Sequence, residues 1–203
     1  KKTWPKVEQA QAAKITLQDK QVGRLIDYLQ SIGEMDNTIL MYTSDNGAHF
    51  AADESGHQLD FFDSNGPLKG GKRDLYEGGV RVPLLVYWKD KIKPGLVTNH
   101  ISAFQDLMPT FAEIIGAEKP QQSNGISFLP TLQGKTQKKH EYLNWEFQLS
   151  GWFQPLPDGG FRQSVRIGQW KGVRYGIESK IELYNLNNDE SETNDLSDEH
   201  PEI

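Results

Sequence analysis

A run of polar residues, Thr43-Ser44-Asp45-Asn46-Gly47, follows directly after a short apolar segment. Ligands in open α/β sheets bind at the carboxyl ends of strands, so this position favours a binding site. The Asp45 carboxylate and the Asn46 amide oxygen are hard ligands of the kind that Ca²⁺ or Mg²⁺ prefers. Asn-Gly is also a common hairpin pair, so these five residues alone leave a metal site and a simple turn both open. No alternating strand returns after Gly47, which weakens the turn interpretation.

A second cluster, residues 66–83, combines glycines with the cations Lys69, Lys72 and Arg73. Glycine lets backbone N–H groups approach a ligand closely, and cationic side chains neutralise sulfate or phosphate oxygens. The segment therefore predicts either an anion-binding loop or a solvated basic turn. Arg81, near its end, could equally fix the loop through an ion pair or contact a substrate.

Histidines near these clusters could add contacts. His49 and His57 lie in the long loop that separates them, where they could contact a sugar or a sulfate or remain exposed. His100, His140 and His200 are predicted to be structural or solvated.

The elements that must position these residues follow from periodicity. Apolar residues at helical spacing predict an amphipathic helix over residues 12–32, whose apolar stripe needs a sheet to cover it. Continuous apolar runs at 38–43 and 84–88 predict strands buried on both faces of a parallel sheet. Between them, residues 48–79 show no periodic pattern, which is typical of a functional loop.

A further helix is predicted from Ser102 to Gly116. Ser102 would be its N-cap with Gln105 at the capping-box position, and Pro109 would kink it. Its predicted buried face consists of Phe104, Leu107, Met108, Phe111, Ile114 and Ile115. Helix, strand, loop, strand and helix in this order indicate an α/β layer.

Beyond residue 136 the pattern changes to short β-rich runs at 142–147, 162–167, 170–175 and 181–185, with a turn signal at 158–160. They predict a small antiparallel sheet. Within the first run, Trp145 and Glu146 could border a sugar site, but the alternation of apolar residues favours a core face for Trp145.

Composition narrows the function classes. The 203 residues carry a net charge of −6, and residues 181–203 hold eight acids and no Lys or Arg, so nucleic acid is not an expected partner. The chain has no cysteine, which excludes disulfides, zinc–thiolate sites and a thiol nucleophile. No apolar run reaches the roughly 20 residues of a membrane span, and no targeting signal is present.

Taken together, the motifs resemble the C-terminal half of the type I sulfatases, and more the bacterial polysaccharide-directed members than the animal arylsulfatases. The resemblance covers essentially the whole chain. It is carried by Asn37 to Gly47, Gly71-Lys72, Tyr76 to Pro83, Ile101 to Gly116, Gly125 to Pro130 and Glu182 to Asn194.

This resemblance implies an alkaline-phosphatase-like α/β sulfatase fold over residues 1–135 and an antiparallel β subdomain over 136–203. It implies that Asp45 and Asn46 ligate Ca²⁺ and that Lys72 contacts the sulfate, while Lys69 is expected to be largely solvated. The family's nucleophile is a formylglycine within a C/S-x-P-S-R motif, which these residues lack.

The chain is therefore interpreted as the C-terminal part of a sulfatase that acts on a sulfated sugar, inactive alone and partnered by the N-terminal part. A periplasmic or secreted enzyme is expected by resemblance. A phosphoesterase of the same superfamily and a non-catalytic glycan-binding or structural module are the alternatives.

Overall fold

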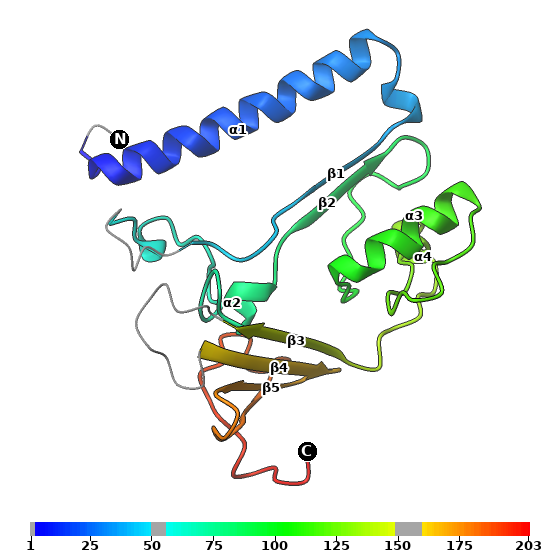
Figure 1. The fold of residues 1–203 in the computed structure, drawn as a ribbon. Coiled ribbons are helices and arrows are strands. Elements are labelled where there is room, and N and C mark those ends of the chain that lie inside the picture. Colours follow the sequence, from blue (N-terminus) through cyan, green and yellow to red (C-terminus); the bar gives the residue numbers. More distant parts are fainter. Residues whose placement is uncertain (1–2, 50–55, 149–159) are drawn as a thin grey trace.

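The computed structural model describes residues 3–49, 56–148 and 160–203 (Figure 1). The elements are α1 Lys6–Ser31, β1 Ile39–Thr43, α2 Glu77–Val80, β2 Leu84–Trp88, α3 Leu107–Ile115, α4 Leu129–Leu132, β3 Leu143–Gln148, β4 Phe161–Ile167, β5 Trp170–Tyr175 and β6 Glu182–Asn185, with 3-10 turns η1 Met35–Asn37, η2 Leu59–Phe61 and η3 Phe104–Asp106. A long helix, α1, lies along the two-stranded sheet, the short helices α3 and α4 lie beside that sheet, and the four-stranded sheet lies below (Figure 1).

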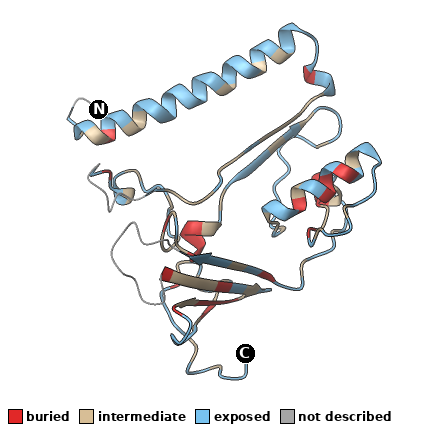
Figure 2. Cartoon of the chain, viewed as in Figure 1, coloured by how far each residue is buried: buried red, intermediate tan, exposed pale blue. Residues whose placement is uncertain are grey.

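The predicted helix over 12–32 is present but begins earlier, at Lys6, directly after Pro5. It ends at Ser31, and Gly33 follows with a positive φ of 74°, a conformation that glycine adopts at little cost. Most of α1 is exposed (Figure 2), including Leu25 of the predicted apolar stripe, and Ile32, which follows the helix, is exposed too. The described part of the chain therefore covers this stripe only in part.

The prediction of a buried parallel sheet is wrong for the first two strands. β1 and β2 pair antiparallel, with Ile39 opposite Trp88 and Thr43 opposite Leu84. Parallel strands need a crossover connection, usually a helix, and the described residues between β1 and β2 form only η2 and the four-residue α2. The pair is not buried on both faces either, since Leu85 is 60% exposed.

The helix predicted over 102–116 begins differently. Ser102 is not its N-cap: the Asp106 carboxylate accepts a hydrogen bond from the Ala103 N–H at 2.8 Å, and α3 follows from Leu107. Pro109 lies in the first turn of α3, where a missing N–H costs no helical hydrogen bond, so no kink is required.

The apolar face of this helix is also not buried as predicted. Met108 is 61% exposed and Ile115 is 76% exposed, and Phe104 and Phe111 on the same side are exposed too. Periodicity correctly gave the helix, but within the described residues nothing covers this face.

The predicted antiparallel sheet of the C-terminal part is confirmed, with the strand order β3-β4-β5-β6. The predicted turn at 158–160 lies mostly outside the described residues, which resume at Gly160. The boundary predicted after residue 135 falls between α4 and β3.

The core that positions the candidate site lies between α2 and the four-stranded sheet. Tyr76, immediately before α2, packs with Val173 of β5 and Tyr184 of β6. Red, buried segments accordingly gather around α2 and the strands below it (Figure 2). Within the described ranges, no helix is long and apolar enough to cross a membrane.

Candidate functional site

Two backbone hydrogen bonds join the loop after β1 to the glycine-rich loop. The Gly47 N–H donates to the Gly79 carbonyl at 2.9 Å, and the Lys72 N–H donates to the Ala48 carbonyl at 2.8 Å. The two clusters that sequence reasoning singled out are thus neighbours, with Ala48 of the first cluster bonded to Lys72 of the second.

Close packing explains the glycine at position 47. A Cβ added there would lie 1.7 Å from the Gly78 carbonyl oxygen, so no other residue fits without moving the backbone. The hairpin interpretation of Asn46-Gly47 is wrong, because β1 pairs with β2, which begins only at Leu84.

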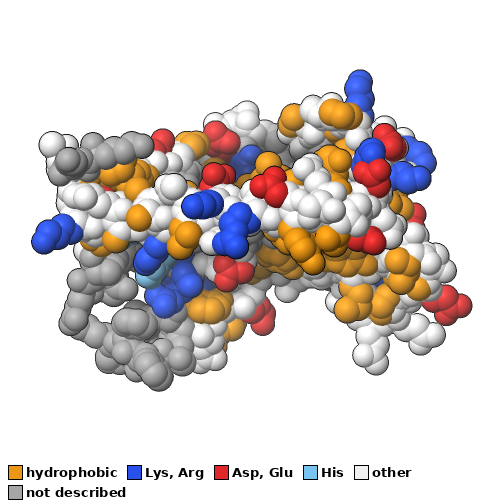
Figure 3. Space-filling model, turned by 90° about the horizontal axis from the view of Figure 1, so that it is seen from above, with side chains coloured by type: hydrophobic (Ala, Val, Ile, Leu, Met, Phe, Trp, Pro, Cys, Tyr) orange, Lys and Arg blue, Asp and Glu red, His pale blue; other side chains and the backbone are white. Residues whose placement is uncertain are grey.

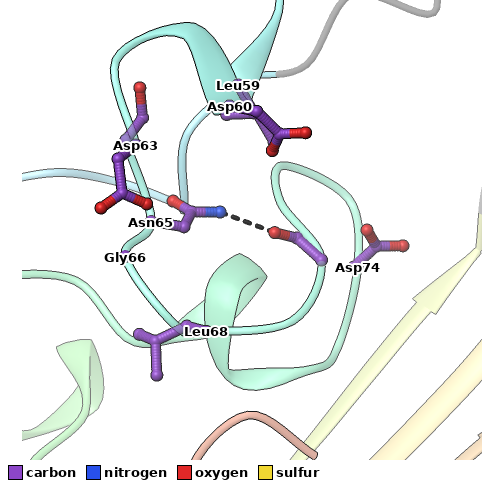
Figure 4. Close-up of a pocket in the computed structure, with 9 residues that line it drawn as sticks. Leu59, Asp60, Asp63, Asn65, Gly66, Leu68 and Asp74 are labelled. Atoms are coloured by element: carbon purple, nitrogen blue, oxygen red, sulfur yellow. Dashed lines mark hydrogen bonds between the residues drawn. The ribbon is translucent and has the colours of Figure 1, made fainter. Parts of the chain in front are cut away.

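Asn65, which sequence reasoning missed, holds the same junction together. Its Nδ2 donates to the carbonyls of Gly70 at 2.6 Å and Gly78 at 3.2 Å, and its Oδ1 accepts from the Ala48 N–H at 3.2 Å. Figure 4 draws the hydrogen bond from this amide to the Gly70 carbonyl as a dashed line. The Asn-Gly pair at 65–66 reads as an ordinary turn, so its sequence gave no sign of these contacts.

The pocket drawn in Figure 4 has a volume of about 250 Å³ and lies next to this junction. Three carboxylates line it, those of Asp60, Asp63 and Asp74, and Lys72 is not among the lining residues. Negative charge repels anions, so this pocket is not suited to hold a sulfate.

The Asp45 carboxylate is exposed and the Asn46 side chain is half-buried. The hydroxyl of Ser44 donates to the Asn46 carbonyl at 2.8 Å, which fixes the turn. Both side chains offer the oxygen ligands that Ca²⁺ takes, but no group of three or more His, Cys, Asp or Glu in the described residues could hold a metal. Within the described residues the pair therefore does not make a complete cation site, and a cation held there would need further ligands.

Lys72 and Lys69 differ in their surroundings. Within the described part of the chain, the half-buried Lys72 ammonium makes no ion pair or hydrogen bond, so it is available to bind an anion. Lys69 instead donates to the Tyr184 hydroxyl at 3.1 Å and lies 3.9 Å above the Tyr76 ring. Its Nζ is also 3.7 Å from Glu182, so the prediction of a largely solvated Lys69 is wrong.

The Glu182 carboxylate accepts the hydroxyl protons of Tyr76 at 2.6 Å and Tyr184 at 2.5 Å. Burial is the largest cause, and the hydrogen bonds to the Glu182 carboxylate the next, of a pKa well above the usual range for both phenols. Both tyrosines therefore stay protonated and keep the glycine-rich loop attached to β6.

A buried group of charges lies behind the Glu77-Gly78-Gly79 segment. Lys171 Nζ is 2.9 Å from Glu77 Oε1 and 3.2 Å from Glu192 Oε1, and Arg166 donates to Glu77 Oε2 at 3.2 Å. Sequence reasoning missed Lys171. Its signal was the period-two alternation with Val173, which puts a lysine on the inward face of β5.

Two predicted site histidines lie in different environments. His57 is 9% exposed, and its Nδ1 is 2.7 Å from Glu8 Oε2 of α1, so the alternative of an exposed loop histidine is wrong. This pair fastens the loop to α1, and a substrate contact of His57 remains a prediction. His49 is exposed and lies next to residues outside the described ranges.

The Asp106 carboxylate, wholly buried, joins three segments. It accepts the Ile126 N–H at 2.8 Å and lies 2.9 Å from His140 Nε2, which confirms a structural role for His140. Thr110 donates to the Asp106 carbonyl at 2.6 Å and accepts from the Phe128 N–H at 3.0 Å. This cluster stabilises α3 and does not reach the candidate site.

Three other residues were left with two interpretations each. Arg81 makes an exposed ion pair with Glu190 at 3.6 Å, which supports a loop-fixing role. Trp145 is half-buried on β3, and Glu146 accepts a hydrogen bond from Gln163.

Comparison with known families gives two matches. Residues 6–117, more than half of the chain, match the sulfatase family, and residues 70–202 match the C-terminal region of N-sulphoglucosamine sulphohydrolase.

Curated relatives agree with these matches. An uncharacterised sulfatase of Schizosaccharomyces pombe is 27% identical over 95% of this chain and 40% of its own length. An N-acetylglucosamine-6-O-sulfatase of Bacteroides thetaiotaomicron is 41% identical over 58% of this chain and 19% of its own length. The chain thus spans well under half the length of these relatives.

Among solved structures, Ps i-CgsB in complex with k-i-k-neocarrahexaose has a TM-score of 0.73 and 30% identity, covering 90% of this chain and 37% of that protein. A protein crystallised with its substrate D-glucosamine-2-N,6-O-disulfate has a TM-score of 0.69 and 27% identity, covering 91% of this chain and 35% of its own.

Proposed function

The chain belongs to the sulfatase family, and from that premise we propose that it is the C-terminal part of an enzyme that hydrolyses sulfate monoesters on a sulfated sugar. The observation that supports this proposal is the pair of backbone hydrogen bonds, Gly47 to Gly79 and Lys72 to Ala48, which joins the segment after β1 to the glycine-rich loop.

In this proposal Asp45 and Asn46 hold one side of a Ca²⁺ ion. Bound there, Ca²⁺ would supply positive charge for the sulfate oxygens. The Ser44 hydroxyl donates to the Asn46 backbone carbonyl and so fixes the turn that carries both side chains. The other ligands come from the N-terminal part of the enzyme.

Lys72 binds a sulfate oxygen and stabilises the negative charge that grows there as the ester bond breaks. Its backbone is held by the Ala48 carbonyl, so the side chain starts from a fixed point. The nucleophile comes from the N-terminal part, because these 203 residues contain no Cys and no C/S-x-P-S-R motif. The 203 residues by themselves are therefore expected to hydrolyse no sulfate ester.

A sulfated sugar is the proposed substrate because one relative, 41% identical, is named an N-acetylglucosamine-6-O-sulfatase, and a solved structure with 27% identity contains its substrate D-glucosamine-2-N,6-O-disulfate. Bacterial relatives of this kind also support a periplasmic or secreted enzyme.

We assign the N-terminal part of the same enzyme to the exposed apolar faces of β2, α3 and α1. These faces carry the exposed residues Leu84, Leu85, Tyr87, Met108, Phe111, Ile115 and Leu25, and the neighbouring Phe104 of η3 and Ile32 after α1 are exposed as well. Figure 3 shows hydrophobic side chains gathered over the middle and right of the face that includes α1. The chain spans 40% or less of its curated relatives, which leaves enough of such a protein to cover these faces.

The site is tested in the enzyme that contains both parts. Lys72→Ala should lower kcat/KM for an aryl or sugar sulfate by about 10²-fold or more, as for other charge-stabilising groups. The exposed Lys20→Ala on α1 is the matched control and should leave kcat/KM unchanged. Near-normal turnover by Lys72→Ala, or turnover of phosphate monoesters but not sulfate monoesters by the parent, would refute the proposal.

Calcium binding is tested separately by calorimetry. Asp45→Asn should weaken Ca²⁺ binding by tenfold or more, because it removes a charged ligand. Asp60→Asn, which changes an acid of the neighbouring pocket, should leave binding as it was. Equal effects of the two variants would place the ion elsewhere.

The docking surface is tested by Leu85→Asp in the complete enzyme. A charge placed in a buried interface is costly, so the thermal midpoint should fall by several degrees. Ile203→Asp, at the exposed C-terminal end, should change it little. An unchanged midpoint in Leu85→Asp would show that this face stays in water.

A further inference from the structure

Lys171 is a lysine with no exposed side-chain surface, and it connects the candidate site to the four-stranded sheet. Its ammonium contacts Glu77 at 2.9 Å and Glu192 at 3.2 Å. Glu192 in turn accepts the Glu77 N–H at 2.6 Å through its other oxygen. Glu77 is therefore held at both its side chain and its backbone.

Charge balance makes this arrangement rigid. Two carboxylates, Glu77 and Glu192, face two cations, Lys171 and Arg166, so the group is neutral as a whole. Burial raises the pKa of Glu192, and the charge of Lys171 opposes that change. An unpaired buried charge is strongly destabilising, so these side chains cannot separate without a large cost.

Glu77 opens α2, and the two glycines after it transmit its position to both loops of the site. The Gly78 N–H donates to the Lys69 carbonyl at 2.8 Å, and the Gly79 carbonyl accepts from the Gly47 N–H at 2.9 Å. The backbone segments are closely packed here, because a Cβ on Gly79 would lie 2.0 Å from the Asp74 carbonyl oxygen. A shift of Glu77 must therefore move both loops.

We propose that Lys171 is a positioning residue for the sulfate and calcium subsites. By fixing Glu77, it sets where the Asp45-Asn46 pair lies relative to Lys72, although it touches neither ligand. This inference rests on the proposed function, since it assigns those residues their roles.

Replacing a buried ion pair by apolar residues of similar size is often neutral or stabilising, so net stability gives little reason for this charge group. The need for fixed distances between the site residues does give a reason for this charge group. Positioning matters because a misplacement of about 1 Å can cost about 10²-fold in rate.

The test uses the complete enzyme and two variants. Lys171→Met leaves two carboxylates facing one arginine and is expected to be unstable or unfolded. The double variant Lys171→Met/Glu192→Gln removes one cation and one anion, so the group stays neutral and the side-chain volumes are nearly kept. It should fold, but kcat/KM should fall tenfold or more, mainly through kcat, and Ca²⁺ should bind several-fold more weakly.

The matched control is Lys180→Met/Asp198→Asn. It removes an ion pair at 2.7 Å in the same subdomain, but that pair is exposed and far from α2 in sequence. Its kcat/KM, Ca²⁺ affinity and folding should equal those of the parent enzyme.

Hydrogen exchange gives a readout that does not depend on activity. In the double variant the amides of Gly47, Lys72 and Gly78 should exchange tenfold faster or more, while those of α3 keep their protection. A double variant with parental kinetics and parental exchange at these amides overturns the proposal. So does a loss of activity that only follows the unfolded fraction. If the parent hydrolyses no sulfate ester, the proposed function fails, and the exchange data still decide the role of Lys171.

Discussion

Gly47→Ala should separate the two loops of the candidate site. The added Cβ would lie 1.7 Å from the Gly78 carbonyl oxygen and 2.9 Å from the Gly79 Cα, both backbone atoms that cannot rotate away. Because non-bonded atoms settle at about 3.5 Å, the loops would have to move apart by about 1.5 Å or more.

The magnitude follows from the contacts that this movement breaks. The hydrogen bonds from Gly47 to Gly79 and from Lys72 to Ala48 contribute about 1 kcal/mol each. Leaving their groups partly unpaired adds to the loss, so the free energy of unfolding should fall by about 2–4 kcal/mol. Activity should fall by about 10²-fold, since Lys72 moves relative to Asp45 by more than 1 Å.

The assay is thermal unfolding and kcat/KM of the complete enzyme, with Gly23→Ala as the control. Gly23 lies at an exposed position in the middle of α1, and no atom lies within 4 Å of its added Cβ. Alanine is the better helix former, so this variant should gain up to about 1 kcal/mol and keep its activity. A Gly47→Ala enzyme as stable and as active as the parent would refute the close approach of the two loops and the site built on it.

Three further outcomes are expected. Lys69→Met should lower the free energy of unfolding by about 1–3 kcal/mol, since it removes a cation–π contact and a charged hydrogen bond, while kcat/KM changes less than tenfold; a larger kinetic loss without a stability loss would contradict this. In a urea titration, Thr110→Val should lower the free energy of unfolding by about 1–3 kcal/mol because it leaves the buried Phe128 N–H unpaired, whereas Thr16→Val on the exposed face of α1 should lower it little. The raised pKa of Tyr76 means that the unfolded chain loses phenolic protons above about pH 10 while the folded chain keeps them. Stability should therefore fall as pH rises past that value, and Tyr76→Phe should fall less steeply; an equal slope would argue against the raised pKa.

Family membership and the location of the candidate site could be read from the sequence, because they depend on local patterns. The end of an apolar run marks Asp45 and Asn46, and glycines beside cations mark the loop of Lys72. The strands of the C-terminal sheet also follow from short β-rich runs separated by turns. In each case neighbouring residues carry the whole signal.

Predictions of burial failed where they needed a partner surface. Periodicity shows that Met108, Ile115 and Leu85 belong to apolar faces, but it does not show what covers them, and all three are exposed among the described residues. The direction of β2 relative to β1 likewise depends on how the intervening loop folds back.

The sequence by itself determined the elements, the residue types at the candidate site and the resemblance to sulfatases. Only the tertiary structure decided that Lys171 pairs with Glu77, 94 residues away, and that Glu192 binds the Glu77 N–H from 115 residues away. Local periodicity places a charged residue on an inward face, but an isolated buried charge is unstable, and its partner is chosen by the packing of segments that are distant in the chain.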